Sequence, residues 1–143
     1  MTTTKSSQRN NAQLTFGITD GVMASVGILA GTWLTHDIKA VAGGLIGVAI
    51  AEGLGMSSGQ YLATKDLGQA TIIGLATAFG CIAPLLAVLT LGLHTLVGVV
   101  ITFAILVALI SFLQEGKKWV NLLRTTIILV IVAVITILVT ARL

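Results

Sequence analysis

Long apolar stretches occupy most of this chain and predict a membrane protein. Of its 143 residues, 56% are hydrophobic and 9% are charged, and the mean hydropathy is +1.06. So few charged side chains cannot coat a soluble globule of this size. A helix needs about 20 apolar residues to cross a hydrocarbon core. Five stretches meet this requirement: residues 14–34, 38–63, 70–91, 96–113 and 119–141.

The breaks between these stretches are only a few residues long, and this sets the topology. Helices joined by short loops run antiparallel. We therefore predict an all-α fold, a polytopic membrane protein with one bundle of five transmembrane helices over residues 14–143, preceded by a polar cytoplasmic segment, residues 1–13. The first stretch is too long for a signal peptide, so we expect it to remain as a span. His36 and His94 fall in two of the breaks and are expected to be exposed.

The basic residues predict the orientation of the bundle, because short loops rich in Lys and Arg stay in the cytoplasm. Six of the eight basic residues fall on one side of the predicted bundle: Lys5, Arg9, Lys65, Lys117, Lys118 and Arg124. Lys39 and Arg142 fall on the other. We expect the N terminus in the cytoplasm and the C terminus on the opposite side, in a bacterial inner membrane or an organelle membrane.

The distribution of basic residues and the lack of a catalytic pair disfavour two classes of function. The net charge of +3 comes from basic residues spread singly along the chain, so we expect no nucleic-acid partner. No nucleophile and base form a recognisable pair, and we do not expect an enzyme. The single cysteine, Cys81, has apolar neighbours and is expected to be a buried thiol.

Two isolated acids, Asp20 and Glu52, interrupt the apolar stretches. An acid inside a membrane is costly and indicates an ion or substrate path. Met56 and Gln60 follow Glu52 by four and eight residues and share its helical face. Carboxylate oxygen and thioether sulfur together suit first-row transition metals. We predict a metal path formed by Asp20, Glu52, Met56 and Gln60.

The helical rise of about 1.5 Å per residue predicts the depths of these side chains. If the first span enters near Gln13 and the second leaves near Lys65, then Asp20, Met56 and Gln60 share one layer. Glu52 lies nearer the bilayer centre.

Each candidate ligand also has a purely structural interpretation. Asp20 can cap the start of the first helix. Glu52 can be a neutral, hydrogen-bonded side chain, because burial disfavours its charged form. Met56 can simply fill a packing gap.

Glycine usage distinguishes the spans from one another. Six of the sixteen glycines lie between residues 43 and 59, at spacings that allow helix backbones to approach closely. We expect the second span to be the central, tightly packed helix. The fifth span carries no glycine and is expected to face lipid.

Two strings carry a family resemblance. Residues 20–25 (Asp-Gly-Val-Met-Ala-Ser) and residues 55–65 (Gly-Met-Ser-Ser-Gly-Gln-Tyr-Leu-Ala-Thr-Lys) resemble the start of helix 1 and the end of helix 2 in the vacuolar iron transporter family. Features of helix 3 are similar as well: Phe79, Gly80, Pro84 and Leu85.

The resemblance implies a homodimer that exchanges Fe²⁺, and often Mn²⁺, for protons, with metal held in the membrane at the dimer interface. By this resemblance the aspartate of helix 1 corresponds to Asp20 and the methionine of helix 2 to Met56. The chain departs from the family at Gln60, where many members have an acid. It also departs between spans 2 and 3, where the cytoplasmic metal-binding insertion is replaced by a few residues.

We therefore expect a transporter that exports Fe²⁺ or Mn²⁺ from the cytoplasm by proton antiport, with the metal as substrate and no resident cofactor. Two alternatives remain. One is a non-transporting membrane scaffold or accessory subunit of the same fold. The other is a small proton-coupled exporter of organic cations that uses Glu52.

Overall fold

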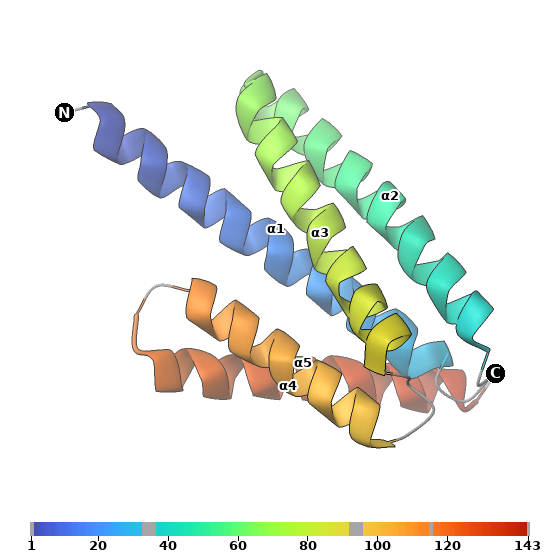
Figure 1. Ribbon diagram of the computed structural model, residues 1–143. Helices are drawn as coiled ribbons and strands as arrows, with labels where there is room; N and C mark the ends of the chain where they lie inside the picture. Colours follow the sequence, from blue (N-terminus) through green and yellow to red (C-terminus); the bar gives the residue numbers. More distant parts are fainter. Residues whose placement is uncertain (1, 33–36, 92–95, 115, 143) are drawn as a thin grey trace.

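The computed structural model describes residues 2–32, 37–91, 96–114 and 116–142, and these residues are almost entirely helical (Figure 1). Five helices follow one another: α1 (Thr2–Thr32), α2 (Ile38–Thr64), α3 (Leu67–Leu91), α4 (Leu96–Leu113) and α5 (Lys118–Thr140). The described residues contain no strand, which confirms the all-α prediction. Because α1 begins at Thr2, the polar segment expected ahead of the first span is a helical extension of it. His36 and His94 lie outside the described residues.

Four of the helices are long and apolar enough to cross a membrane: residues Arg9–Gly31 of α1, all of α2, residues Leu67–Leu86 of α3, and all of α5. Such a set indicates a multi-pass membrane protein. Helix α4 covers the residues expected for the fourth span, and its role as a span stays a prediction.

The centre of the molecule is α3, and not α2 as the glycine count predicted. Helices α1 and α2 both pack along α3, whereas α1 and α2 touch each other much less. The hairpin of α4 and α5 packs against the other side of α1 (Figure 1). Helix α1 begins and α5 ends at opposite ends of the bundle, as five antiparallel helices require.

Close glycine contacts explain why α1 and α3 lie together. A methyl group at Gly21 would overlap the carbonyl oxygen of Thr77, and one at Gly80 would overlap that of Ile18. Helices α2 and α3 approach in the same way, because a methyl group at Gly74 would lie 2.7 Å from the carbonyl oxygen of Gly53. Small residues at such crossings let backbones touch without hydrophobic drive from the lipid.

Most of the glycines in α2 make no such contact. A methyl group at Gly43, Gly47, Gly55 or Gly59 would meet nothing within 4 Å. The expectation of a central α2 was wrong. The spacing of glycines shows that a helix face can pack closely against another helix, but it does not show which helix covers that face. Helix α5 agrees with its expected place, since most of its apolar side chains after Thr126 are exposed.

The connection between α2 and α3 consists of two residues. Lys65 adopts a left-handed conformation (φ 57°), and its N–H donates to the carbonyl oxygen of Tyr61, which ends α2. Asp66 then accepts a hydrogen bond at 3.1 Å from the backbone N–H of Gln69 and so caps α3. This tight turn holds the polar end of the α2–α3 hairpin next to α1.

Candidate functional site

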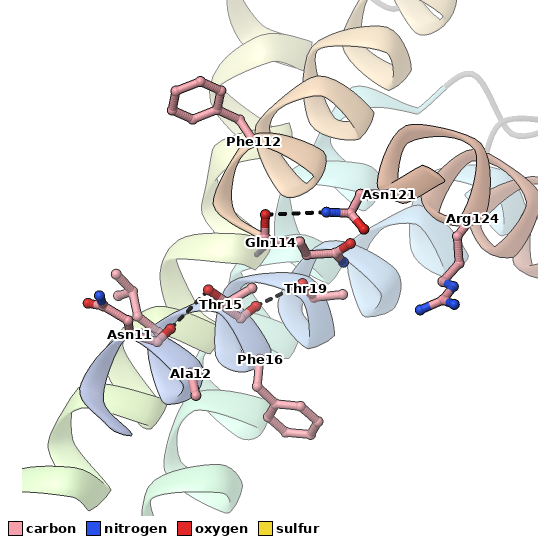
Figure 2. A pocket seen from close by; sticks show the side chains of 10 residues that line it. Asn11, Ala12, Thr15, Phe16, Thr19, Phe112, Gln114, Asn121 and Arg124 are labelled. Carbon is pink, nitrogen blue, oxygen red and sulfur yellow. Dashed lines mark hydrogen bonds between the residues drawn. The ribbon is translucent and has the colours of Figure 1, made fainter. Parts of the chain in front are cut away.

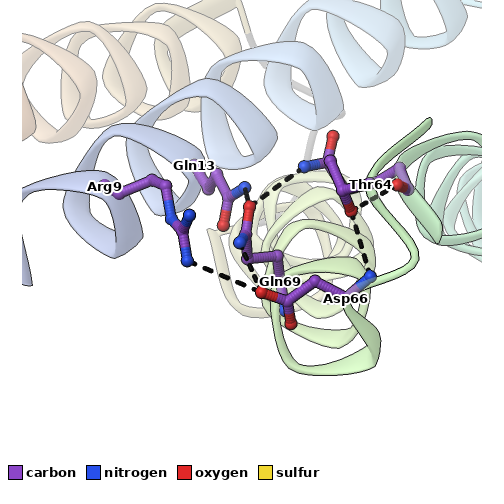
Figure 3. Close-up of polar contacts among 6 residues, drawn as sticks. Arg9, Gln13, Thr64, Asp66 and Gln69 are labelled. Carbon is purple, nitrogen blue, oxygen red and sulfur yellow. Dashed lines mark hydrogen bonds and ion pairs between the residues drawn. The ribbon is translucent and has the colours of Figure 1, made fainter. Parts of the chain in front are cut away.

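A group of hydrogen-bonded amides joins α1, α2 and α3 at the end of the bundle that carries the α2–α3 turn. The side chain of Gln69 is buried, and its Oε1 accepts hydrogen bonds from Nε2 of Gln13 at 2.7 Å and Nε2 of Gln60 at 3.3 Å. Its own Nε2 donates to the carboxylate of Asp66, which also lies 3.5 Å from the Arg9 guanidinium (Figure 3). We call these five residues the Gln69 cluster.

The Gln69 cluster gives Gln60 a structural role that the sequence did not predict. One N–H of its amide is used to join α2 to α3. Neither Gln13 nor Gln69 was identified as a candidate from the sequence. The sequence does place these two amides at the ends of otherwise apolar spans. Amides at such positions are also typical of the membrane interface, so they did not predict a contact between helices.

The cluster fixes the relative depth of the expected metal ligands. Asp20 follows Gln13 by seven residues, so it lies on nearly the same face of α1 and about 10 Å further into the bundle. Glu52 precedes Gln60 by eight residues on α2, which places it about 12 Å further in. Because Gln13 and Gln60 both bond to Gln69, Asp20 and Glu52 lie at nearly the same depth.

The expected layer of Asp20, Met56 and Gln60 is therefore wrong for Gln60, which lies two turns of helix away from Asp20. The depth estimate assumed that Gln13 and Lys65 are level, whereas Gln13 is level with Gln60. Met56 lies one turn from Glu52, between that acid and Gln60, and is half-buried.

Cys81 of α3 lies beside α1 next to Asp20. A methyl group at Gly21, the residue after Asp20, would lie 2.9 Å from the backbone nitrogen of Cys81. Gly53, the residue after Glu52, packs against Gly74 and Ala78 of the same helix α3. The thiol is completely buried and donates to the carbonyl oxygen of Gly21 at 3.3 Å. This confirms the prediction that Cys81 is a buried thiol.

The surroundings of the two acids differ. Asp20 is half-buried in the middle of α1, so the alternative that it caps the start of this helix is wrong, because α1 begins at Thr2. Glu52 is exposed on α2. Neither acid forms a hydrogen bond or ion pair within the described part of the chain.

The open face of α2 adjoins Glu52. Gly55 and Gly59 follow Glu52 by three and seven residues and share its side of the helix. Together with Gly43, Gly47 and Ala51 they form a row of small, mostly exposed residues at four-residue spacing, which we call the α2 glycine row. A carboxylate exposed to hydrocarbon costs about 3 kcal/mol or more. Glu52 beside this row therefore indicates a face covered by something other than lipid.

The candidate metal ligands around the two acids are few in the described part of the chain. Among the described residues, no three His, Cys, Asp or Glu side chains gather closely enough to hold an ion. Asp20, Glu52 and the thioether of Met56 offer two carboxylates and one soft ligand. A fuller set needs backbone oxygens, water or a second chain.

No family model, curated protein or solved structure matches the chain. The resemblance to the vacuolar iron transporters stays a prediction from the sequence, chiefly from the strings at residues 20–25 and 55–65. Both strings contribute to the site, the first through Asp20 and the second through Met56 and Gln60.

Proposed function

We propose that this protein is a membrane transporter that exports Fe²⁺ or Mn²⁺ from the cytoplasm in exchange for protons. The observation that carries the proposal is the shared depth of Asp20 and Glu52, two acids that form no ion pair within the described part of the chain. Ionisable side chains inside a membrane are costly and mark ion or substrate paths.

The ligand chemistry supports a transition metal as the substrate. Carboxylates bind hard and borderline cations, and the thioether of Met56 adds the soft character that Fe²⁺ and Mn²⁺ tolerate better than Mg²⁺ does. Coordination needs both carboxylates in the charged form. A proton that reaches Asp20 or Glu52 therefore competes with the metal, and this competition couples the two fluxes.

A homodimer completes the proposed site. A second copy that packs on the α2 glycine row would bring two Glu52 side chains to one interface and supply each ligand twice. It would also remove Glu52 from lipid.

Transport by the purified protein in sealed liposomes tests the proposal, with an Fe²⁺- or Mn²⁺-sensitive dye inside. We expect Asp20→Asn and Glu52→Gln each to lower metal flux by about tenfold or more, because each removes an anionic ligand but keeps the side-chain size. Asp37→Asn is the matched control. Asp37 caps α2 through hydrogen bonds to Lys39 and Ala40 at the other end of the helix, and Asn preserves a cap.

Wild-type flux in both variants would reject the proposal. The main alternative is a non-transporting scaffold, in which Gln60 serves only to join α2 to α3 through its hydrogen bond to Gln69. Metal binding to the purified protein distinguishes the two. A transporter binds Mn²⁺ more weakly as the pH falls, and a scaffold shows no binding at any pH.

A further inference from the structure

A cavity of about 770 Å³ lies between the first part of α1 and the ends of α4 and α5 that meet at their turn. It is separate from the Gln69 cluster and from both acids. Figure 2 shows Asn11, Thr15 and Thr19 of α1 and Asn121 and Arg124 of α5 around it. The cavity runs from Asn11 to Thr19, which is about 12 Å along α1.

Arg124 is the one charged residue among the ten described residues that line this cavity. It follows the start of α5 by six residues, about 9 Å, and the apolar run of α5 begins just after it. Its side chain is exposed and forms no ion pair within the described part of the chain. A guanidinium at this depth is costly unless it meets an anion or reaches the interface.

The lining of the cavity combines polar and apolar side chains. Amide groups of Asn11 and Gln114 offer N–H donors near the end of the bundle. Phe16 and Phe112, with side chains that are 58% and 76% exposed, border the same space with apolar surface. An anionic head beside Arg124 and an apolar body beside the aromatic rings fit an amphipathic ligand better than a free ion.

A second positive charge, that of Lys118, lies beside the cavity. The ammonium group of Lys118 donates to the carbonyl oxygens of Phe112 at 2.7 Å and Gln114 at 3.1 Å, and so is held beside two lining residues. Lys117 directly precedes α5, next to Lys118. Basic residues at one membrane surface attract anionic lipids.

We propose that this cavity binds the phosphate headgroup of an anionic phospholipid, with the guanidinium of Arg124 as its principal ligand and the acyl chains along Phe16. Arginine suits this role because its planar fork donates two parallel hydrogen bonds to phosphate oxygens. The lipid fills the space between α1 and the α4–α5 hairpin. The site is independent of metal transport.

Native mass spectrometry of the full-length protein in detergent tests the site, with phosphatidylglycerol and phosphatidylcholine of identical acyl chains as probes. We expect the protein to bind phosphatidylglycerol about fivefold more strongly, and Arg124→Gln to remove this preference. Arg142→Gln is the matched control, because it removes the same charge from the other end of α5 and should keep the preference.

A second variant separates the cavity from the charge alone. Ala12 is exposed and lines the cavity, so Ala12→Trp should fill the space without unfolding the bundle and should lower phosphatidylglycerol binding with every charge in place. Equal losses in Arg124→Gln and Arg142→Gln, or unchanged binding in Ala12→Trp, would overturn the proposal. So would inorganic phosphate that displaces the lipid at equal concentration, because that identifies a site for soluble anions.

Discussion

Asp66 connects the α2–α3 turn with α1 and stabilises the start of α3. The pKa of its carboxyl is lowered below the usual value by the hydrogen bond from the backbone N–H of Gln69, then by the side-chain amide of Gln69, with a smaller contribution from Arg9. A carboxyl with a lowered pKa stabilises the folded state only while it is ionised. This contribution is fully present above the pKa of the unfolded chain, near 4, and is lost as the pH falls through the lower pKa of the folded state.

We predict that Asp66→Ala lowers the melting temperature by about 2–4 °C at pH 7, because the helix cap and the contact with Arg9 are both lost. The difference from the wild type should shrink as the pH is lowered from 5 towards 2. Thermal unfolding in detergent across this range measures it. Asp66→Asn is the control, since Asn retains a cap but cannot titrate. A difference that persists unchanged at low pH would contradict this account.

At the level of single residues, the sequence identified the acids Asp20 and Glu52 but not the amides of Gln13 and Gln69. Asp20 and Glu52 are easily recognised, because an acid in an apolar stretch is costly and therefore indicates a function. The burial of Cys81 followed from its apolar neighbours in the same way. Gln13 and Gln69 gave no comparable signal, because an amide near the end of a span is satisfied equally well by water and by another helix. Their pairing depends on residues 56 positions apart in the chain.

At the level of helices, glycine has two distinct roles in this protein. Gly21 and Gly80 lie where the backbones of α1 and α3 touch, and Gly43 lies on an open face of α2. The same substitution should therefore have opposite consequences at the two kinds of position.

We predict that Gly21→Ala and Gly80→Ala each destabilise the protein by about 1–3 kcal/mol, because the added methyl group meets a backbone oxygen that cannot rotate away. Gly43→Ala should leave the stability unchanged or raise it slightly, since alanine favours a helix and meets nothing within 4 Å. Unfolding in mixed detergents compares the three. Equal effects at all three positions would show that helix propensity and not the contact of α1 with α3 decides the outcome.

At the level of the whole molecule, the α2 glycine row marks the face on which we expect a second copy. Bulky side chains at Gly55 and Gly59 should keep the fold, because neither position contacts the rest of the chain within 4 Å. They should separate the helices of two copies, because close packing of membrane helices needs small residues.

We predict that the double variant Gly55→Ile, Gly59→Ile weakens self-association by about tenfold or more in light-scattering measurements in detergent. Ala104→Ile adds bulk to an exposed position of α4 and serves as the control that should remain associated. A double variant that associates like the wild type would exclude the α2 glycine row as the interface.

The sequence by itself determined the helical class, the five segments and the two acids that make this chain a candidate ion carrier. Hydropathy and helical period are properties of a segment and need no knowledge of its neighbours. The tertiary structure alone decided that α3 is central, that Asp20 is level with Glu52 instead of Gln60, and that a cavity opens beside Arg124. These features depend on which of several glycine-bearing faces meet. Lipid provides no hydrophobic force that brings one of these faces, and not another, into contact with a neighbouring helix. The packing of complete helices therefore determines which faces meet.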